Sequence, residues 1–260
     1  MLTKEQLQDL SKKKKTNEYV VSREFLQLVF LKELYGNSFS EDIYFKGGTC
    51  IRLVYGGSRF SEDLDFTVDM EEEDFKKNVE KFFKQMSSSY PIEFKEKETI
   101  AGRTYLATIK TGLLKQEVYI KLDFSFREKP LEPAQEIVKD IDYPIIFKGF
   151  VNCLSKDEVF AEKIRAFLNR EKARDVYDLW ILLELGAKYR EELIAKKVSY
   201  YDVEYKKEDM LKRIKALSKE SFVTELRPFV PTNEREGLGD LFEYICEYLK
   251  KVWAIDRKLI

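Results

Sequence analysis

The chain has 260 residues, with 46 Lys and Arg against 47 Asp and Glu, a formal net charge of −1 and no histidine. The missing histidine excludes Ser-His-Asp and Cys-His catalytic groups and every zinc or iron site that uses imidazole, which leaves carboxylates and hard ions such as Mg²⁺. The near-neutral charge excludes the overall basic footprint of a protein that coats duplex DNA, and the 44% hydrophobic content excludes a disordered chain.

Neither a membrane span nor a metal-binding cysteine pair is predicted. No apolar run approaches the about 18 residues that a membrane helix needs. Residues 1–6 are polar and include a glutamate, unlike a secretory signal. The three cysteines, Cys50, Cys153 and Cys246, form no CxxC motif, which excludes a zinc ribbon. We therefore expect a cytoplasmic protein with no membrane partner.

The first 153 residues are predicted to combine helices and strands. Ser22 is a candidate cap for the second helix, Gly47-Gly48 is expected to turn the chain after a short strand, and Gly112 is expected in a hairpin. Helical periodicity predicts helices at 3–15, 22–35, 49–55 and 71–85. Strands are predicted at 43–46, 63–68, 104–110, 116–126 and 145–151.

After residue 153 the pattern predicts helices only. A helix over 174–185, for example, is expected to bury Trp180 and Leu183. The chain is therefore predicted to be an α+β protein of two domains, a mixed sheet with helices over 1–153 and a helical bundle over 154–260.

Two aspartates, Asp63 and Asp65, share one face of the predicted strand over 63–68. Alternate strand residues point the same way and lie about 6.6 Å apart along the strand. Two carboxylates on one rigid face repel each other unless a cation lies between them. Upstream, Gly47-Gly48 lets the backbone approach a phosphate, and the helix that starts at Thr49 offers N–H groups at the positive end of its dipole.

A third aspartate, Asp123, projects from the polar face of the strand predicted over 116–126. It can join Asp63 and Asp65 if its strand is their neighbour in the sheet. Three converging carboxylates form a two-metal site for phosphoryl or nucleotidyl transfer. An isolated Asp-x-Asp strand is more often a solvated edge and an isolated Gly-Gly only a turn, but the order of the elements favours the functional interpretation.

The order of these elements resembles the polymerase-β-like nucleotidyltransferase superfamily, in which a Gly-Gly or Gly-Ser turn precedes Asp-x-Asp and a later acid. Phe-Lys-Gly-Gly-Thr at 45–49 and Arg-Phe-Ser-Glu-Asp-Leu-Asp-Phe at 59–66 are similar to the AbiEii/AbiGii toxin family of nucleotidyltransferases. Glu-Lys-Ile-Arg at 162–165 and Lys-Ala-Arg-Asp-Val-Tyr-Asp-Leu-Trp at 172–180 resemble that family's second block. The resemblance implies a polymerase-β-like nucleotidyltransferase front and a C-terminal helical bundle that completes a nucleotide-binding cleft.

The resemblance also implies an activity. The enzyme would depend on Mg²⁺ or Mn²⁺ and would move a nucleoside monophosphate from an NTP to an acceptor hydroxyl. RNA is the implied acceptor, in particular the 3′ end of a tRNA, and a cognate antitoxin is the implied partner in a toxin–antitoxin or phage-defence pair. An RNA acceptor needs a local basic face, and the candidates for it are Arg165, Arg170, Lys172 and Arg174.

Each motif residue receives a role from the resemblance. Asp63 and Asp65 would bind the metal ion, and Asp123 would bind it and activate the acceptor hydroxyl. Lys163 would contact the phosphates, and Asp175 matches the family's Arg-Asp position in the catalytic set. The candidates for nucleotide binding are Lys46, Gly47, Gly48, Thr49, Arg59, Ser61 and Asp178.

Simpler interpretations stay open at this point. Asp175 and Asp178 fit a salt-bridged helix surface, and Tyr119 is expected in the core. The whole protein could also be a nucleotide- or antitoxin-binding module without turnover. A further alternative is a small-molecule adenylyltransferase or phosphotransferase that uses the same site. Surface or loop positions without function are the alternatives for Lys46, Arg59 and Ser61.

Overall fold

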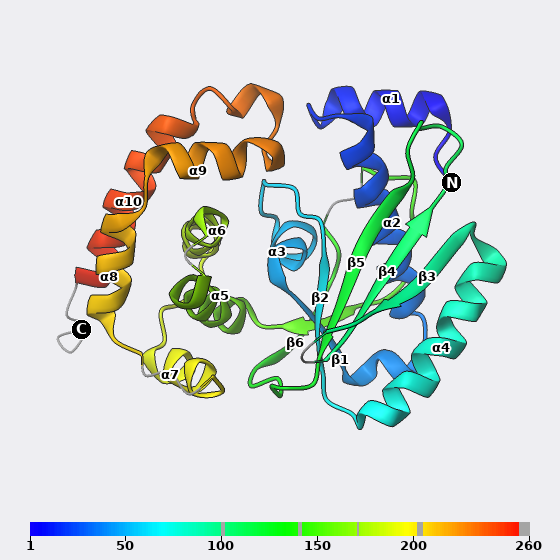
Figure 1. Cartoon of the computed structure of the whole chain (residues 1–260), viewed down its shortest axis with the longest axis horizontal. Coiled ribbons are helices and arrows are strands. Elements are labelled where there is room, and N and C mark those ends of the chain that lie inside the picture. Colours follow the sequence, from blue (N-terminus) through cyan, green and yellow to red (C-terminus); the bar gives the residue numbers. More distant parts are fainter. Residues whose placement is uncertain (100–101, 140–141, 171, 202–204, 255–260) are drawn as a thin grey trace. The chain divides into compact units, whose positions relative to one another are not determined.

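The computed structural model describes residues 1–99, 102–139, 142–170, 172–201 and 205–254 (Figure 1). The chain divides into two compact units, unit 1 over Met1–Ser155 and unit 2 over Lys156–Ile260. The division lies two residues after the boundary expected from the sequence. Unit 1 combines a sheet with helices and unit 2 is helical, so the predicted α+β fold with a helical C-terminal part is confirmed.

In the described part of unit 1, seven strands form one mixed sheet in the order β3-β4-β5-β2-β1-β7-β6. The β2–β5 and β1–β7 pairs are parallel, and the other pairs are antiparallel. The strands are β1 (Ile43–Lys46), β2 (Leu64–Val68), β3 (Ile92–Lys97), β4 (Arg103–Ile109), β5 (Val118–Ser125), β6 (Pro133–Glu136) and β7 (Val151–Leu154).

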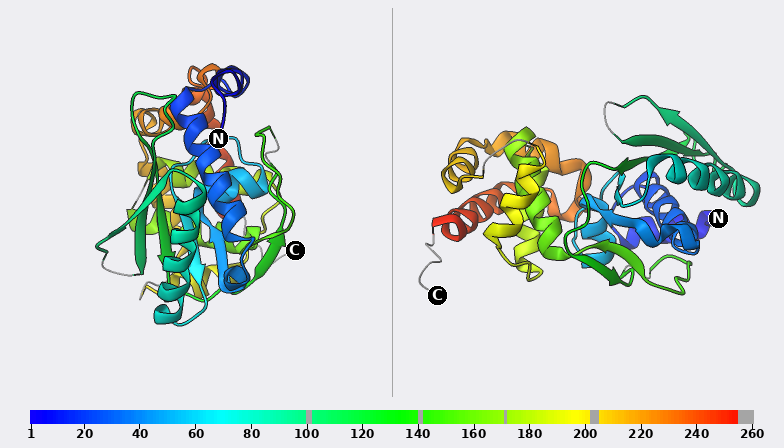
Figure 2. Two further views of the ribbon diagram at one scale, coloured as in Figure 1. Left: turned by 90° about the vertical axis from the view of Figure 1, so that its right-hand side faces the viewer. Right: turned by 90° about the horizontal axis from the view of Figure 1, so that it is seen from below.

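An aromatic core joins the sheet to two helices, α2 (Glu18–Leu34) and α4 (Glu72–Ser89). Figure 2 shows both helices on the same side of the strands. Phe30 of α2 lies 5.6 Å from Phe82 of α4 and 6.3 Å from Phe66 of β2, between ring centroids. Burying each such ring stabilises the fold by about 1.5–3 kcal/mol. Because neighbouring strand residues alternate in direction, the residues next to these rings point to the opposite face.

The other helical segments of unit 1 differ from the sequence prediction in two places. The second helix begins at Glu18, where the Asn17 side chain accepts a hydrogen bond from the Val20 N–H at 2.9 Å. Ser22 is therefore a buried residue inside the helix and not its cap. The helix expected from Thr49 begins two residues earlier, so Gly47-Gly48 is part of it. The remaining segments are α1 (Lys4–Lys13), a 3₁₀ turn (Ser38–Asp42), α3 (Gly47–Cys50) and a π-helical turn (Ile51–Tyr55).

Two edge strands were not predicted, and one predicted strand is wrong. Strand β3 carries only two apolar residues among four charged ones, and β6 begins with a proline and has no large apolar side chain. Both compositions are typical of sheet edges, where charge and proline block further pairing. Residues 145–150 form no strand, and their apolar side chains, such as Ile146, lie partly or largely exposed. Pairing begins only at Val151.

Unit 2 is built around α5, which contacts α6 and α7. Lys197 of α7 is fully buried and forms ion pairs with Glu158 at 2.6 Å and Glu162 at 3.1 Å on α5. On α6 the buried leucines are Leu179 and Leu182, whereas the expected Trp180 and Leu183 are only partly buried. The helices are α5 (Lys156–Arg170), α6 (Ala173–Glu184), α7 (Glu191–Ser199), α8 (Lys207–Ala216), α9 (Lys219–Leu226) and α10 (Leu238–Ala254), with 3₁₀ turns at Arg227–Phe229 and Thr232–Glu234. Among the described helices of both units, none is long and apolar enough to cross a membrane.

Candidate active site

The Gly47-Gly48 backbone lies directly against the Asp65 side chain. Strands β1 and β2 pair with Lys46 opposite Asp65, and Gly47 follows at once. A Cβ atom on Gly47 would lie 2.1 Å from Oδ2 of Asp65, and the φ angle of +78° also favours glycine. The glycine therefore brings main chain into contact with a strand carboxylate that a side chain would displace.

Two more predicted residues lie against the second glycine. A Cβ atom on Gly48 would lie 2.6 Å from Nη2 of Arg59 and 2.9 Å from Oγ of Ser61. The buried Arg59 also donates to the Phe60 carbonyl at 3.0 Å. The structure thus brings Arg59, Ser61 and the glycine pair together, as their proposed role in phosphate binding requires.

Side chains from four neighbouring strands form one polar row across the sheet. Asp65 of β2 is paired with Asp123 of the parallel strand β5, which in turn is paired with Thr104 of β4. Lys46 of β1 completes the row beside Asp65. Paired residues point to the same face of a sheet, so the expected meeting of Asp123 with the Asp-x-Asp strand is observed.

A lysine that the sequence did not single out belongs to the same face. Lys121 lies two residues before Asp123 on β5, and its Nζ is 2.5 Å from Oδ2 of Asp123. Partial burial works against its charge, but the hydrogen bond to Asp123 and the charges of Asp123, Asp63 and Asp65 raise the pKa of Lys121 above its ordinary value. The lysine therefore partly neutralises the three carboxylates. Its position two residues before Asp123 on the same strand was the feature of the sequence that could have identified it.

Polar side chains of α2 hold the loop that leads to Asp63. Gln27, which is buried, donates from Nε2 to the carbonyls of Ser61 at 3.1 Å and Glu62 at 2.9 Å. Arg23 pairs with Glu62 at 2.8 Å. From the other side, the buried Thr49 hydroxyl donates to the Asp63 carbonyl, so any contact of Thr49 with a ligand would use its backbone. Sequence analysis missed Arg23 and Gln27, although polar residues on an otherwise apolar helix were visible.

The three predicted site residues of unit 2 also lie together. Nζ of Lys163 is 2.7 Å from Oδ2 of Asp178 and 3.4 Å from Oδ1 of Asp175, and both aspartates are fully buried. Arg170 holds Asp175 with two hydrogen bonds of 2.7 and 2.8 Å. The alternative of a salt-bridged surface is therefore wrong for this pair, since both carboxylates point inward.

A match to a family model identifies the family to which these motifs belong. The model described as "Nucleotidyl transferase AbiEii toxin, Type IV TA system" matches residues 29–251, which include the motifs of both units. The chain belongs to this family. It is a nucleotidyltransferase toxin of a type IV toxin–antitoxin system, and the family and enzyme class expected from the sequence are confirmed.

Solved structures show the same fold as this AbiEii-family chain. The nucleotidyltransferase toxin MenT4 from Mycobacterium tuberculosis is 18% identical, with a TM-score of 0.65, over 100% of this chain and 96% of that chain. The protein JHP933 from Helicobacter pylori is 21% identical, with a TM-score of 0.50, over 89% of this chain and 94% of that chain. Comparison with curated proteins gave no match.

The donor chemistry of the AbiEii site fits a hard divalent ion only if other ligands contribute. Among the described residues, no group of three or more Cys, Asp or Glu side chains is arranged to hold a metal ion. Both oxygens of Asp123 already accept hydrogen bonds, from Thr104 at 2.6 Å and from Lys121. Mg²⁺ is commonly bound by one or two carboxylates with water and substrate phosphates. Asp63 and Asp65 fit that pattern.

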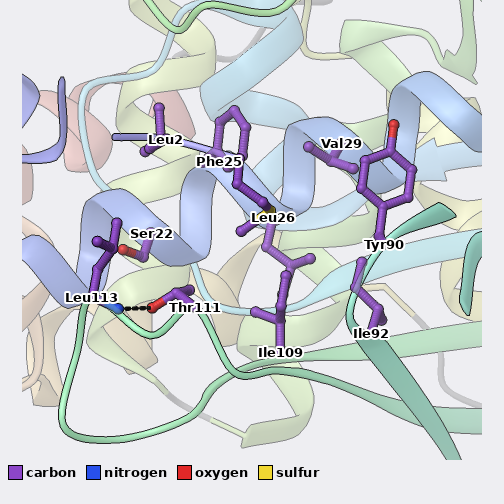
Figure 3. Close-up of a pocket in the computed structure, with 11 residues that line it drawn as sticks. Leu2, Ser22, Phe25, Leu26, Val29, Tyr90, Ile92, Ile109, Thr111 and Leu113 are labelled. Atoms are coloured by element: carbon purple, nitrogen blue, oxygen red, sulfur yellow. Dashed lines mark hydrogen bonds between the residues drawn. The ribbon is translucent and has the colours of Figure 1, made fainter. Parts of the chain in front are cut away.

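An apolar pocket elsewhere in unit 1 lacks the chemistry of this site. Figure 3 shows it between α2 and the β3–β4 edge, with Phe25, Ile92 and Ile109 among the lining residues. It contains no charged side chain, and its Tyr90 hydroxyl donates to Glu33 at 2.8 Å. The polar row, and not this pocket, is therefore the candidate active site.

Replacing Gly47 with alanine is expected to abolish most nucleotidyl transfer by displacing the Asp65 carboxylate. The positive φ angle adds a stability cost of about 1–2 kcal/mol. Gly112→Ala is the matched control, because Gly112 has a φ of +69° and nothing within 4 Å of an added Cβ. Thermal unfolding should show a loss of stability in both variants, at least as large at Gly47, whereas transfer assays should show a loss of activity only at Gly47. Equal activities would contradict the contact.

Proposed function

We propose that this toxin moves a nucleoside monophosphate from an NTP to a hydroxyl of an RNA acceptor, with Mg²⁺ or Mn²⁺ bound. The observation that carries the proposal is the packing of the Gly47-Gly48 backbone against Asp65. It places main chain that can approach a phosphate beside a carboxylate that can bind a metal ion. A carboxylate strand that served only as a solvated edge would not require this contact.

Different residues of unit 1 would bind the metal ion and the phosphates. When bound by Asp63 and Asp65, the ion would neutralise phosphate charge and favour departure of pyrophosphate. The N–H groups of the Gly47-Gly48 segment, with Arg59 and Ser61 beside them, would hold the phosphate oxygens.

Asp123 would accept the proton of the attacking hydroxyl. Thr104 and Lys121 fix the Asp123 carboxylate in the polar row. The group that takes the proton is therefore already in place before the RNA binds. Lys46, buried at the β1 end of the row, remains a candidate phosphate contact.

In unit 2 we propose Lys163 as the phosphate contact. Asp175 and Asp178 would position its ammonium group, because two buried carboxylates at 3.4 and 2.7 Å restrict where that group can lie. The burial of Asp178 favours this positioning role over direct contact with the nucleotide.

The RNA acceptor is supported by the family resemblance more than by the basic residues expected around it. Arg170 is paired with Asp175, Arg165 lies 4.0 Å over the ring of Tyr201, and Arg174 stacks in the same way on an aromatic ring of unit 2. Three of the four candidate cations thus make contacts inside unit 2. Any cationic path for RNA therefore also has to draw on other residues.

Incubation with each labelled NTP, Mg²⁺ and total tRNA should transfer label to RNA from at least one NTP. EDTA should abolish the transfer, and Mg²⁺ or Mn²⁺ should restore it, because the paired carboxylates need a cation to accept a triphosphate. Transfer that survives EDTA would contradict the metal requirement. Label in small molecules alone would favour a small-molecule transferase, and calorimetric NTP binding without any product would favour a binding module.

A further inference from the structure

An exposed tyrosine continues the polar face of β5 beyond the catalytic candidates. Tyr119, Lys121 and Asp123 occupy alternate positions of one strand, so their side chains share a face. Tyr119 is 51% exposed, and the Lys121 side chain is 48% exposed. Tyr105 of β4, by contrast, is buried in the aromatic core. The expectation that Tyr119 is a core residue is therefore wrong.

A second tyrosine restrains this ring without covering it. The rings of Tyr19 and Tyr119 meet edge to face, with centroids 6.4 Å apart and an interplanar angle of 68°. The guanidinium of Arg23 lies 5.5 Å over the Tyr19 ring and pairs with Glu62, which directly precedes Asp63. The tyrosine pair is thus linked to the loop that contains Asp63 and leads into β2.

We infer that Tyr119 and Lys121 form a binding site for the end of a single-stranded RNA acceptor. The ring would stack on a base near that end, and the ammonium of Lys121 would contact the adjoining phosphate. An aromatic ring beside a cation is how proteins bind single strands without reading their sequence, and stacking contributes about 1–3 kcal/mol per base. The inference rests on the proposed function, since Asp123 is taken as the group beside the acceptor hydroxyl.

The position of Tyr119 in the sheet favours the RNA acceptor over the NTP as the ligand of this site. The triphosphate candidates lie at β1, whereas Tyr119 lies on β5, on the far side of β2. Tyr119 is also about 13 Å along β5 from Asp123, two steps of about 6.6 Å, with Lys121 at the midpoint. A strand whose hydroxyl reaches Asp123 would therefore pass Lys121 before its bases reach the ring.

A run of lysines lies close in the sequence to Tyr19, the ring partner of Tyr119. Residues 12–15 are four consecutive lysines at the end of α1, only a few residues before Tyr19. Lys12 and Lys15 are exposed, while Lys13 and Lys14 pair with Asp142. Phosphates of an extended strand are favoured near such a run.

The test is the affinity of the full chain for a short fluorescein-labelled oligoribonucleotide of mixed sequence, measured by anisotropy. Tyr119→Ala should weaken binding roughly five- to 150-fold, as the loss of one stacked base predicts, whereas Tyr119→Phe should retain it. Affinity falls as salt rises, and Lys121→Gln should make the slope of log affinity against log salt less steep by about 0.7. Phe150→Ala, which removes a 60% exposed ring elsewhere in unit 1, should leave binding unchanged.

Calorimetry with NTP separates the two nucleotide ligands. Tyr119→Ala should bind NTP as the wild type does; a loss of NTP affinity with RNA affinity retained would overturn the inference. Unchanged RNA affinity in Tyr119→Ala, or a wild type that binds no RNA, would overturn it as well. A wild type that binds RNA through Tyr119 but transfers no nucleotide would support this binding site and contradict the proposed function.

Discussion

Replacing Asp65 with asparagine is expected to lower nucleotidyl transfer roughly 10²- to 10³-fold, because a bound metal ion stabilises several kcal/mol of developing charge. Asp65 is the carboxylate that contacts Gly47 and pairs with Asp123 across the parallel strands. The asparagine keeps the shape of the side chain but removes one charge of the proposed metal site. Transfer from labelled NTP, measured over a range of Mg²⁺ concentrations, checks the prediction.

The fold of the Asp65→Asn variant should stay intact. Removing the charge of Asp65 lessens its repulsion with the neighbouring carboxylates but also its attraction to Lys121, so the thermal unfolding temperature should stay close to that of the wild type. Asp69→Asn is the matched control, since Asp69 directly follows the other end of β2 and pairs with Lys129 at 2.9 Å. Its transfer rate should equal that of the wild type. Full activity in Asp65→Asn would contradict the proposed metal site.

Replacing Lys163 with methionine is expected to destabilise unit 2 by about 3–5 kcal/mol, as is usual when one partner of a buried ion pair is removed. The change takes away the ammonium that lies 2.7 Å from Asp178, while Arg170 still holds Asp175. Methionine conserves most of the side-chain volume, so loss of packing adds little. The expected result is therefore an electrostatic loss confined to the buried cluster.

Tryptophan fluorescence reports this unfolding selectively, because both tryptophans of the chain, Trp180 and Trp253, lie in unit 2. The double variant Lys163→Met, Asp178→Asn should recover part of the stability, since no uncompensated charge is then left at Asp178. Lys250→Met removes a lysine from a surface pair with Glu247 on α10, also in unit 2, and should leave the stability of unit 2 nearly unchanged. Equal effects at Lys163 and Lys250 would contradict the role of burial.

The sequence predicted the parts of the site whose geometry is local. Alternation along β2 and β5 was enough to put Asp65 and Asp123 on polar faces, and the Gly-Gly pair marked the end of β1. The resemblance to the family then selected Lys163, and also Asp175 and Asp178, for which the residue pattern alone left a salt-bridged helix surface open.

Features that depend on tertiary contacts escaped prediction. Arg23 and Gln27 are buried because the loop before Asp63 packs on α2, and no local pattern specifies that contact. That Lys121 lies on the same face as the candidate carboxylates could be inferred only once β5 was known to lie beside β2. Residues 145–150 carry the apolar composition of a strand, but nothing in their sequence says that no neighbouring strand pairs with them.

The parallel pairing of β2 with β5 has a consequence for how the toxin becomes active during folding. Asp65 and Asp123 are 58 positions apart in the chain, yet they sit opposite each other in the finished sheet. Contacts of such high sequence separation form slowly, since a long loop must close, at a cost in entropy, before the strand pairing can stabilise the chain. Newly made or partly folded chains therefore lack the paired carboxylates, and the harmful activity should emerge only when the central sheet is complete.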